Sequence, residues 1–173
     1  MGGGSAAGTI DPGEDRMKVF ISYGSAADQV TALRLQALGA VNGLAVYVPP
    51  AYTRQFQSAL IDPESAQKMN EADVILGVVG MAISDACWQE LQASRASPKP
   101  TIVMAAPHVA PQLLPAFGSD LIVFDPARPD AAELEIVQRL KNVEAGQPTK
   151  KALIALGAVA LSLLILAAFA PQD

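Results

Sequence analysis

The 173-residue sequence has only one cysteine, Cys87, and one histidine, His108. A single cysteine cannot form a disulfide within the chain, which fits a reducing compartment. A zinc site of the usual cysteine and histidine kind needs more of these ligands, so we expect no metal site. The net charge is −5 and no stretch is strongly basic, which argues against duplex nucleic acid as a partner.

The first residues lack the apolar run of a secretory signal peptide. Residues 1–16 are rich in glycine and then acidic, so we expect a disordered leader there. The following residues, 17–145, have the composition of an ordinary globular domain. A short polar stretch over residues 146–151 is interpreted as a linker.

Charge is absent from Ala152–Ala170, where the only polar side chain is Ser162. As a helix these 19 residues would be about 28 Å long, close to the ~30 Å hydrocarbon core of a bilayer. Lys150 and Lys151 precede the segment, and cations on this flank favour a cytosolic N-terminal side. The sequence therefore predicts a single-pass transmembrane helix over 152–170, a tail over 171–173 and a soluble domain in the cytosol. The alternative, a core helix, would normally show a polar stripe.

Short apolar runs alternate with helical patterns through the domain. Five runs are typical of strands: Lys18–Tyr23, Leu44–Val48, Asp73–Val79, Thr101–Ala105 and Leu121–Phe124. The third run is continuously apolar, as in parallel strands that are covered on both faces. Alternation of this kind predicts an α/β fold, with a five-stranded, parallel, doubly wound sheet of flavodoxin-like order.

Helical spacing and capping residues indicate the helices. The first helix, over about residues 26–40, has apolar residues at helical spacing: Val30, Leu33, Ala37, Leu38 and Val41. Asp62 followed by Pro63 is typical of a helix start, and Ser84 is a second capping residue. A last helix is expected to begin near Asp130, with Glu133 three residues later as in a capping box.

Ligands of doubly wound sheets bind at the carboxyl ends of the strands, near the switch point in strand order. Three segments are expected to meet there: Tyr23–Ala27, Pro49–Arg54 and Val79–Glu90. The helix that begins at Ser84 would present an N-terminus able to attract a phosphate group.

Three motifs occur in order along the domain: FISYGSAAD from Phe20, EADVILGVVG from Glu71 and SDACWQEL from Ser84. Together they resemble the motifs of TIR (Toll/interleukin-1 receptor) domains, over roughly residues 17–145. In NAD+-cleaving members the glutamate of the last motif is catalytic, and this resemblance carries the role to Glu90. Cys87 matches the cysteine of the family, whereas the tryptophan position falls on Ala86.

The chemistry of NAD+ cleavage is compatible with one glutamate. Breaking the bond between nicotinamide and ribose develops positive charge on the ribose, and nicotinamide leaves as a neutral molecule. No general acid is needed, and one carboxylate beside the ribose can stabilise the developing charge. Ordinary glycosidases, in contrast, use two carboxylates. We therefore expect Glu90 to stand exposed at the mouth of the sheet, beside the bound sugar.

The crevice and the resemblance together suggest a set of substrate-binding residues: Tyr23, Gly24, Ser25, Pro50, Tyr52, Arg54, Ser84, Cys87 and Trp88. NAD+ is expected as a substrate, with no separate cofactor. The resemblance also implies that the domain associates with other TIR domains and that the membrane clusters it. It further implies NAD+ depletion as a means of defence, with ADP-ribose or a cyclic form as the product.

Other functions remain open at this point. A non-enzymatic TIR adaptor would bind other TIR domains through the loop after the second strand, and Glu90 would be incidental. A flavodoxin-like FMN protein is disfavoured, because Ala26, Ala27 and Asp28 offer no hydroxyl donors for a phosphate. A phosphoacceptor receiver domain is disfavoured too, since its acidic pair after the first strand and its aspartate at the end of the third are missing.

Overall fold

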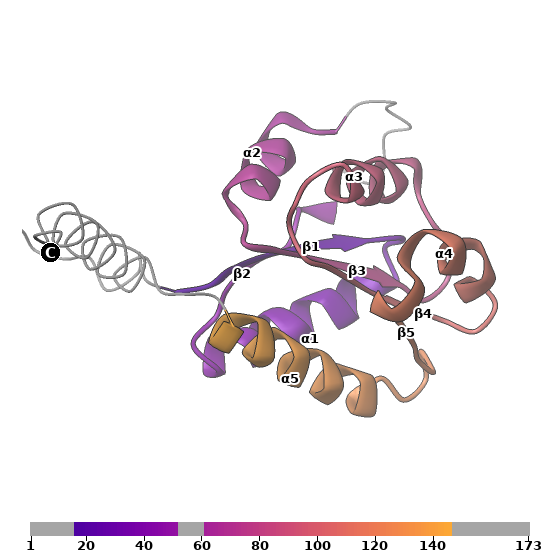
Figure 1. Cartoon of the computed structure of the whole chain (residues 1–173). Helices are drawn as coiled ribbons and strands as arrows, with labels where there is room; N and C mark the ends of the chain where they lie inside the picture. Colours follow the sequence, from indigo (N-terminus) through magenta and orange to yellow (C-terminus); the bar gives the residue numbers. More distant parts are fainter. Residues whose placement is uncertain (1–15, 52–60, 147–173) are drawn as a thin grey trace, which may run out of the picture. The chain divides into compact units, whose positions relative to one another are not determined.

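The structure is a computed structural model that describes residues 16–51 and 61–146 (Figure 1). The predicted leader up to residue 15, the linker over 147–151, the transmembrane segment over 152–170 and the tail lie outside these residues. So do two predicted substrate contacts, Tyr52 and Arg54. Among the residues that are described, no helix is both long enough and apolar enough to cross a membrane.

Five parallel strands form one sheet: β1 (Lys18–Tyr23), β2 (Ala45–Tyr47), β3 (Val74–Val79), β4 (Thr101–Ala105) and β5 (Leu121–Val123). Their order is β2-β1-β3-β4-β5. This order confirms the predicted parallel α/β sheet and is consistent with a flavodoxin-like fold. All six residues of β3 are buried, as expected for a parallel strand that is covered on both faces.

Helices follow the strands in regular alternation: α1 (Asp28–Val41), α2 (Pro63–Glu71), α3 (Asp85–Arg95), α4 (Ala110–Phe117) and α5 (Asp130–Gly146), with a 3-10 turn, η2 (Gly118–Asp120), before β5. In Figure 1, α2, α3 and α4 lie on one face of the sheet, and α1 and the start of α5 lie on the other. Residues up to Gln138 form one compact unit, and the last described residues, 139–146, belong to a second.

The helix starts predicted from capping residues are those observed. The Asp62 carboxylate accepts a hydrogen bond from the backbone N–H of Ser65, and Pro63 opens α2. The Ser84 hydroxyl likewise accepts from the N–H of Cys87 at 3.2 Å and caps α3. Each cap satisfies an N–H that has no partner within its own helix.

Two apolar clusters pack on the α2–α3–α4 face of the sheet. Under α2, Phe20, Met69 and Ile75 pack together, and the ring of Tyr47 stacks on Phe20 with 5.8 Å between centroids. Under α3 and α4 a larger cluster is formed by Val79, Cys87, Leu91, Val103, Ala105, Val109, Ala110, Leu113 and Phe117. These clusters hold α2 and α3 against the sheet and thereby fix the positions of the side chains that α3 directs toward β1.

Helix α1 packs on the opposite face of the sheet. Its buried side consists of Ala32, Leu35 and Gly39, together with Asp28. A Cβ atom at Gly39 would lie 2.4 Å from Val46 Cγ2, so the close approach of α1 to β2 requires glycine there. The residues at apolar helical spacing in the sequence, Val30, Leu33, Ala37, Leu38 and Val41, face solvent instead.

Candidate functional site

The switch point of the sheet lies between β1 and β3, and the loops that follow these strands are pressed together. The N–H of Gly24 donates to the carbonyl of Val78 at 2.9 Å, and the N–H of Ser84 donates to the carbonyl of Gly24 at 3.1 Å. A Cβ atom at Gly24 would lie only 2.1 Å from the Ala82 carbonyl oxygen. Glycine is therefore needed at this position for the two loops to meet.

Asp28 connects the same two loops. Its side chain is only 4% exposed, and Oδ1 accepts a hydrogen bond from the N–H of Gly80 at 2.7 Å. Oδ2 accepts from the Ser25 hydroxyl, also at 2.7 Å. The Ser25 hydroxyl, which was predicted to contact substrate, thus donates within the protein. The aspartate of the FISYGSAAD motif has a structural task here, because it closes the switch point.

Glu90 is buried, and the expectation that it stands exposed is wrong. Its residue exposure is 2%, and Oε2 accepts a hydrogen bond of 2.6 Å from the hydroxyl of Ser22 in β1. The physical reason is the helical repeat of α3. Glu90 follows Cys87 by three residues and precedes Leu91, and all three side chains lie on the side of α3 that packs on the sheet.

Ser22 connects the carboxylate with the thiol. It is fully buried, and its Oγ lies 3.2 Å from Cys87 Sγ as well as 2.6 Å from Glu90 Oε2. A hydroxyl has one proton, so donation to the carboxylate leaves its oxygen free to accept from the thiol. A distance of 2.6 Å lies within the ordinary range for a hydroxyl that donates to a carboxyl oxygen. Ser22 was not among the predicted site residues, although it belongs to the FISY run.

Tyr23 ties the end of β1 to the loop after β2. Its ring is fully buried, and its hydroxyl donates to the Pro49 carbonyl at 2.8 Å. Pro50 follows at a half-buried position. The segment predicted to contact substrate after β2 therefore starts from a fixed point beside β1.

The structure separates Trp88 from the buried group on α3. Its side chain is 37% exposed, whereas the neighbouring Cys87 is fully buried. Cys87 and Glu90 face the sheet together with Ser22, while Ser84 serves as the helix cap above them. Of the predicted residues on this helix, only Cys87 and Glu90 are brought into contact with the same side chain.

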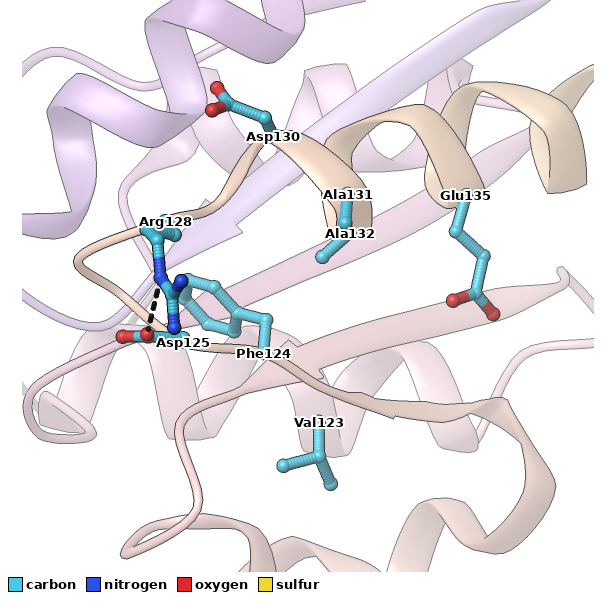
Figure 2. Close-up of a pocket in the computed structure, with 8 residues that line it drawn as sticks. All are labelled: Val123, Phe124, Asp125, Arg128, Asp130, Ala131, Ala132 and Glu135. Atoms are coloured by element: carbon cyan, nitrogen blue, oxygen red, sulfur yellow. Dashed lines mark hydrogen bonds and ion pairs between the residues drawn. The ribbon is translucent and has the colours of Figure 1, made fainter.

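A separate hollow of about 470 Å³ lies where β5 leads into α5 (Figure 2). Arg128 pairs with Asp125 at 3.4 Å across its mouth, and Figure 2 shows the Asp130 carboxylate turned away from that pair. Asp130 pairs instead with Arg34 of α1. The remaining lining residues are Val123, Phe124, Ala131, Ala132 and Glu135. None of the predicted substrate-binding residues lines this hollow.

Comparison of the sequence with known proteins adds no family to the geometry of Glu90, Ser22 and Cys87. No protein-family model matches the chain, and no curated protein is significantly similar to it. The TIR resemblance therefore remains a prediction that rests on three motifs and their order.

Proposed function

We propose that this protein is a membrane-anchored NAD+ nucleosidase of the TIR type, with Glu90 as its catalytic residue. The observation that supports the proposal best is the 2.6 Å hydrogen bond from Ser22 to Glu90 Oε2. It holds a carboxylate in one orientation between β1 and α3, near the carboxyl end of β1. In doubly wound sheets this is the end at which ligands bind.

In the proposed reaction the bond between nicotinamide nitrogen and ribose C1 breaks, and both bonding electrons leave with nicotinamide. The ribose acquires positive charge, which Glu90 stabilises. Water then adds to C1 and loses a proton to solvent, giving ADP-ribose; attack by a group of the same nucleotide would give a cyclic product. A carboxylate removed from bulk water stabilises such charge more strongly than an exposed one, since less solvent screens the interaction.

The substrate would reach Glu90 from the side of the loop after β2. Tyr23 fixes Pro49 next to β1 through its hydroxyl, and the predicted substrate contacts of the segment that begins there are Pro50, Tyr52 and Arg54. Those residues would contact the nucleotide, while Ser22 of β1 would orient the Glu90 carboxylate through its hydrogen bond. The predicted transmembrane helix over 152–170 would confine copies of the domain to one plane and raise their effective concentration.

A second candidate is a non-enzymatic TIR adaptor, anchored in the same way. The burial of Glu90 favours it, because a buried carboxylate bound by a serine also serves as a polar link between a helix and a strand. The internal hydrogen bond of Ser25 favours it as well. In this function the domain would act only by binding other TIR domains.

The full chain reconstituted in liposomes with NAD+ separates the two functions. Nicotinamide release is measured by chromatography at increasing protein-to-lipid ratios, and co-flotation with the liposomes tests the anchor. The enzyme should release nicotinamide at high surface density, and Glu90→Gln should lower the rate by about 10²–10³-fold, the usual effect of losing one stabilising group. The control is Glu64→Gln, at an exposed position in the first turn of α2.

Glutamine at position 90 keeps the shape of the side chain and can still accept from Ser22, so the variant should fold. Circular dichroism checks this. Absence of nicotinamide release at every density, with a folded and membrane-bound protein, would support the adaptor. Equal activity in Glu90→Gln and Glu64→Gln would remove Glu90 from the mechanism.

A further inference from the structure

Ser65, in the first turn of α2, has a buried hydroxyl without a partner. The residue is 1% exposed, and its Oγ atom finds no hydrogen-bond partner in the described part of the chain. The other buried serines there, Ser22 and Ser94, both donate hydrogen bonds, at 2.6 and 2.8 Å. A hydroxyl that is removed from water without a partner destabilises the fold. A buried group of this kind needs an explanation, and a role in binding is one.

The start of α2 fixes the position of Ser65. Its backbone N–H donates to the Asp62 carboxylate at 3.1 Å, and Pro63 opens the helix. Ser65 and Met69 are the buried residues of α2, and their spacing of four places them on one face of the helix. Met69 packs with Phe20 of β1. The Ser65 side chain therefore points toward the sheet.

Ser65 lies at about the same height along β1 as Ser22. The N–H of Asp73, just after α2, donates to the Lys18 carbonyl at 2.8 Å, so the end of α2 stands beside the start of β1. Counting back from Asp73 to Ser65 gives eight residues, most of them helical, or roughly 12 Å. Counting forward from Lys18 to Ser22 gives four residues of strand, or about 13 Å. Helix and strand run in opposite directions, so the two counts end at the same level.

The Glu90 carboxylate is held at this level too, because it accepts from Ser22. Phe20 and Ser22 are two positions apart in β1 and face the same side of the sheet, Phe20 toward α2 and Ser22 toward α3. Figure 1 shows both helices on this face, and both contact β1. The unpartnered hydroxyl of Ser65 and the fixed carboxylate of Glu90 therefore lie at one level of β1, on the same face of the sheet.

A sugar hydroxyl is the group that fits this pair. It can donate to a carboxylate, and it can donate to a serine hydroxyl or accept from it. An anionic group would be repelled by Glu90, and an apolar group would leave the Ser65 hydroxyl without a partner. Ribose carries its 2′- and 3′-hydroxyls on adjacent carbons, so one ribose can bind both side chains at once.

We propose that Ser65 is a substrate-contacting residue, whose hydroxyl bonds to a hydroxyl of the ribose that Glu90 stabilises. Ser65 thereby selects ribose over deoxyribose at this position. Its role depends on the proposed function, because it adds a second contact to the same sugar. Ser65 and Glu90 are both buried, so the substrate has to part α2 from α3 in order to reach them.

Nicotinamide release by the full chain in liposomes tests this contact. Ser65→Ala should lower kcat/KM for NAD+ by about 3–10-fold, the usual effect of losing one neutral hydrogen bond. Two NAD+ analogues are compared with it, one lacking the 2′-hydroxyl and one lacking the 3′-hydroxyl of the nicotinamide ribose. For one analogue the parent and the variant should have the same kcat/KM, because the partner of Ser65 is already missing.

Ser94→Ala is the matched control, and its expected results are the opposite. Ser94 is 2% exposed, and its hydroxyl is engaged within α3. Its loss should lower the melting temperature by about 2–7 °C and leave kcat/KM per folded molecule unchanged. Ser65→Ala should melt at the temperature of the parent or above it, since no hydrogen bond of the fold is lost and alanine favours the helix.

A Ser65→Ala chain that melts as far below the parent as Ser94→Ala overturns the proposal, since the hydroxyl would then serve the fold. An equal loss of kcat/KM on NAD+ and on both analogues also overturns it. A parent that releases no nicotinamide at any surface density overturns the proposed function and this role of Ser65 together. An active parent with an equally active Ser65→Ala variant removes Ser65 alone.

Discussion

Ser22→Ala provides a sharp test of the hydrogen bond that holds Glu90. The substitution removes only a hydroxyl, which is fully buried and donates to the carboxylate at 2.6 Å. Water cannot easily replace it, because Glu90 is only 2% exposed. Hydrogen bonds to charged groups contribute about 1.5–3 kcal/mol to stability. We expect the free energy of unfolding to fall by about this amount.

Ser94→Ala is the matched control. Ser94 lies on the same helix as Glu90, is 2% exposed as Glu90 is, and donates to the Leu91 carbonyl at 2.8 Å. Its partner is neutral, and such a bond contributes only about 0.5–1.5 kcal/mol. The Ser22 variant should therefore lose roughly twice as much stability as the Ser94 variant.

Thermal unfolding of the full chain in detergent, followed by circular dichroism, measures both losses. For a domain of this size 1 kcal/mol corresponds to about 3–5 °C, so Ser22→Ala should melt roughly 5–15 °C lower than the parent. The same substitution in a Glu90→Leu background should cost much less, since the buried acceptor is then gone. Equal losses in both backgrounds would refute the assignment of the hydroxyl to Glu90.

Three further substitutions test other contacts. Gly80→Ala would place a Cβ atom 2.4 Å from the Asp28 Oδ1 atom, so it should lower the unfolding free energy by about 1–3 kcal/mol, whereas Gly146→Ala, where nothing lies within 4 Å, should not. Burial raises the pKa of Glu133 above its usual 4.5, so the folded state binds more protons than the unfolded state and loses stability as pH rises from 4.5. Glu133→Gln should abolish that loss. The unfolding free energy of the variant, measured in urea, should therefore rise relative to that of the parent between pH 4 and about pH 7. A difference that shrinks over this pH range would contradict the reasoning. Lys99 donates to two carbonyls at the end of α2, at 2.7 and 2.6 Å, so Lys99→Met should destabilise by about 1–3 kcal/mol, and an unchanged midpoint would show that these bonds contribute nothing.

The strands were predictable because each is a short, strongly apolar run bounded by turn residues or charge. Helix α4 was not located in advance, and its sequence explains why. Ala110–Phe117 contains Pro111 and Pro115, and proline is unfavourable inside a helix. Pro111 stands in the first turn, where no N–H partner is needed, but Pro115 lies in the interior. Packing of Leu113 and Phe117 into the core compensates for that cost.

Helix α1 shows what periodicity cannot decide. The buried residues Ala32, Leu35 and Gly39 repeat at helical spacing, and so do the more hydrophobic residues that face solvent. Both sets predict a helix, but which set is buried depends on how closely α1 approaches the sheet. Val46 approaches so closely that only glycine fits at position 39, which excludes the bulkier side from the core.

The burial of Glu90 could not be predicted from the sequence either. Its position also explains how two of the motifs are connected in the fold. Its spacing from Cys87 and Leu91 already indicates the buried side of α3, but a carboxylate is ordinarily placed in solvent unless a partner is known. The partner is Ser22, 68 positions away in the sequence, and no local rule connects the two. The FISY and SDACWQEL motifs meet at Ser22, whose hydroxyl lies 3.2 Å from Cys87 Sγ and forms this hydrogen bond with Glu90. If it serves only the fold, Ser22→Ala should change stability and leave the rate of nicotinamide release per folded molecule unchanged; if it orients a catalytic carboxylate, that rate should fall with KM nearly constant.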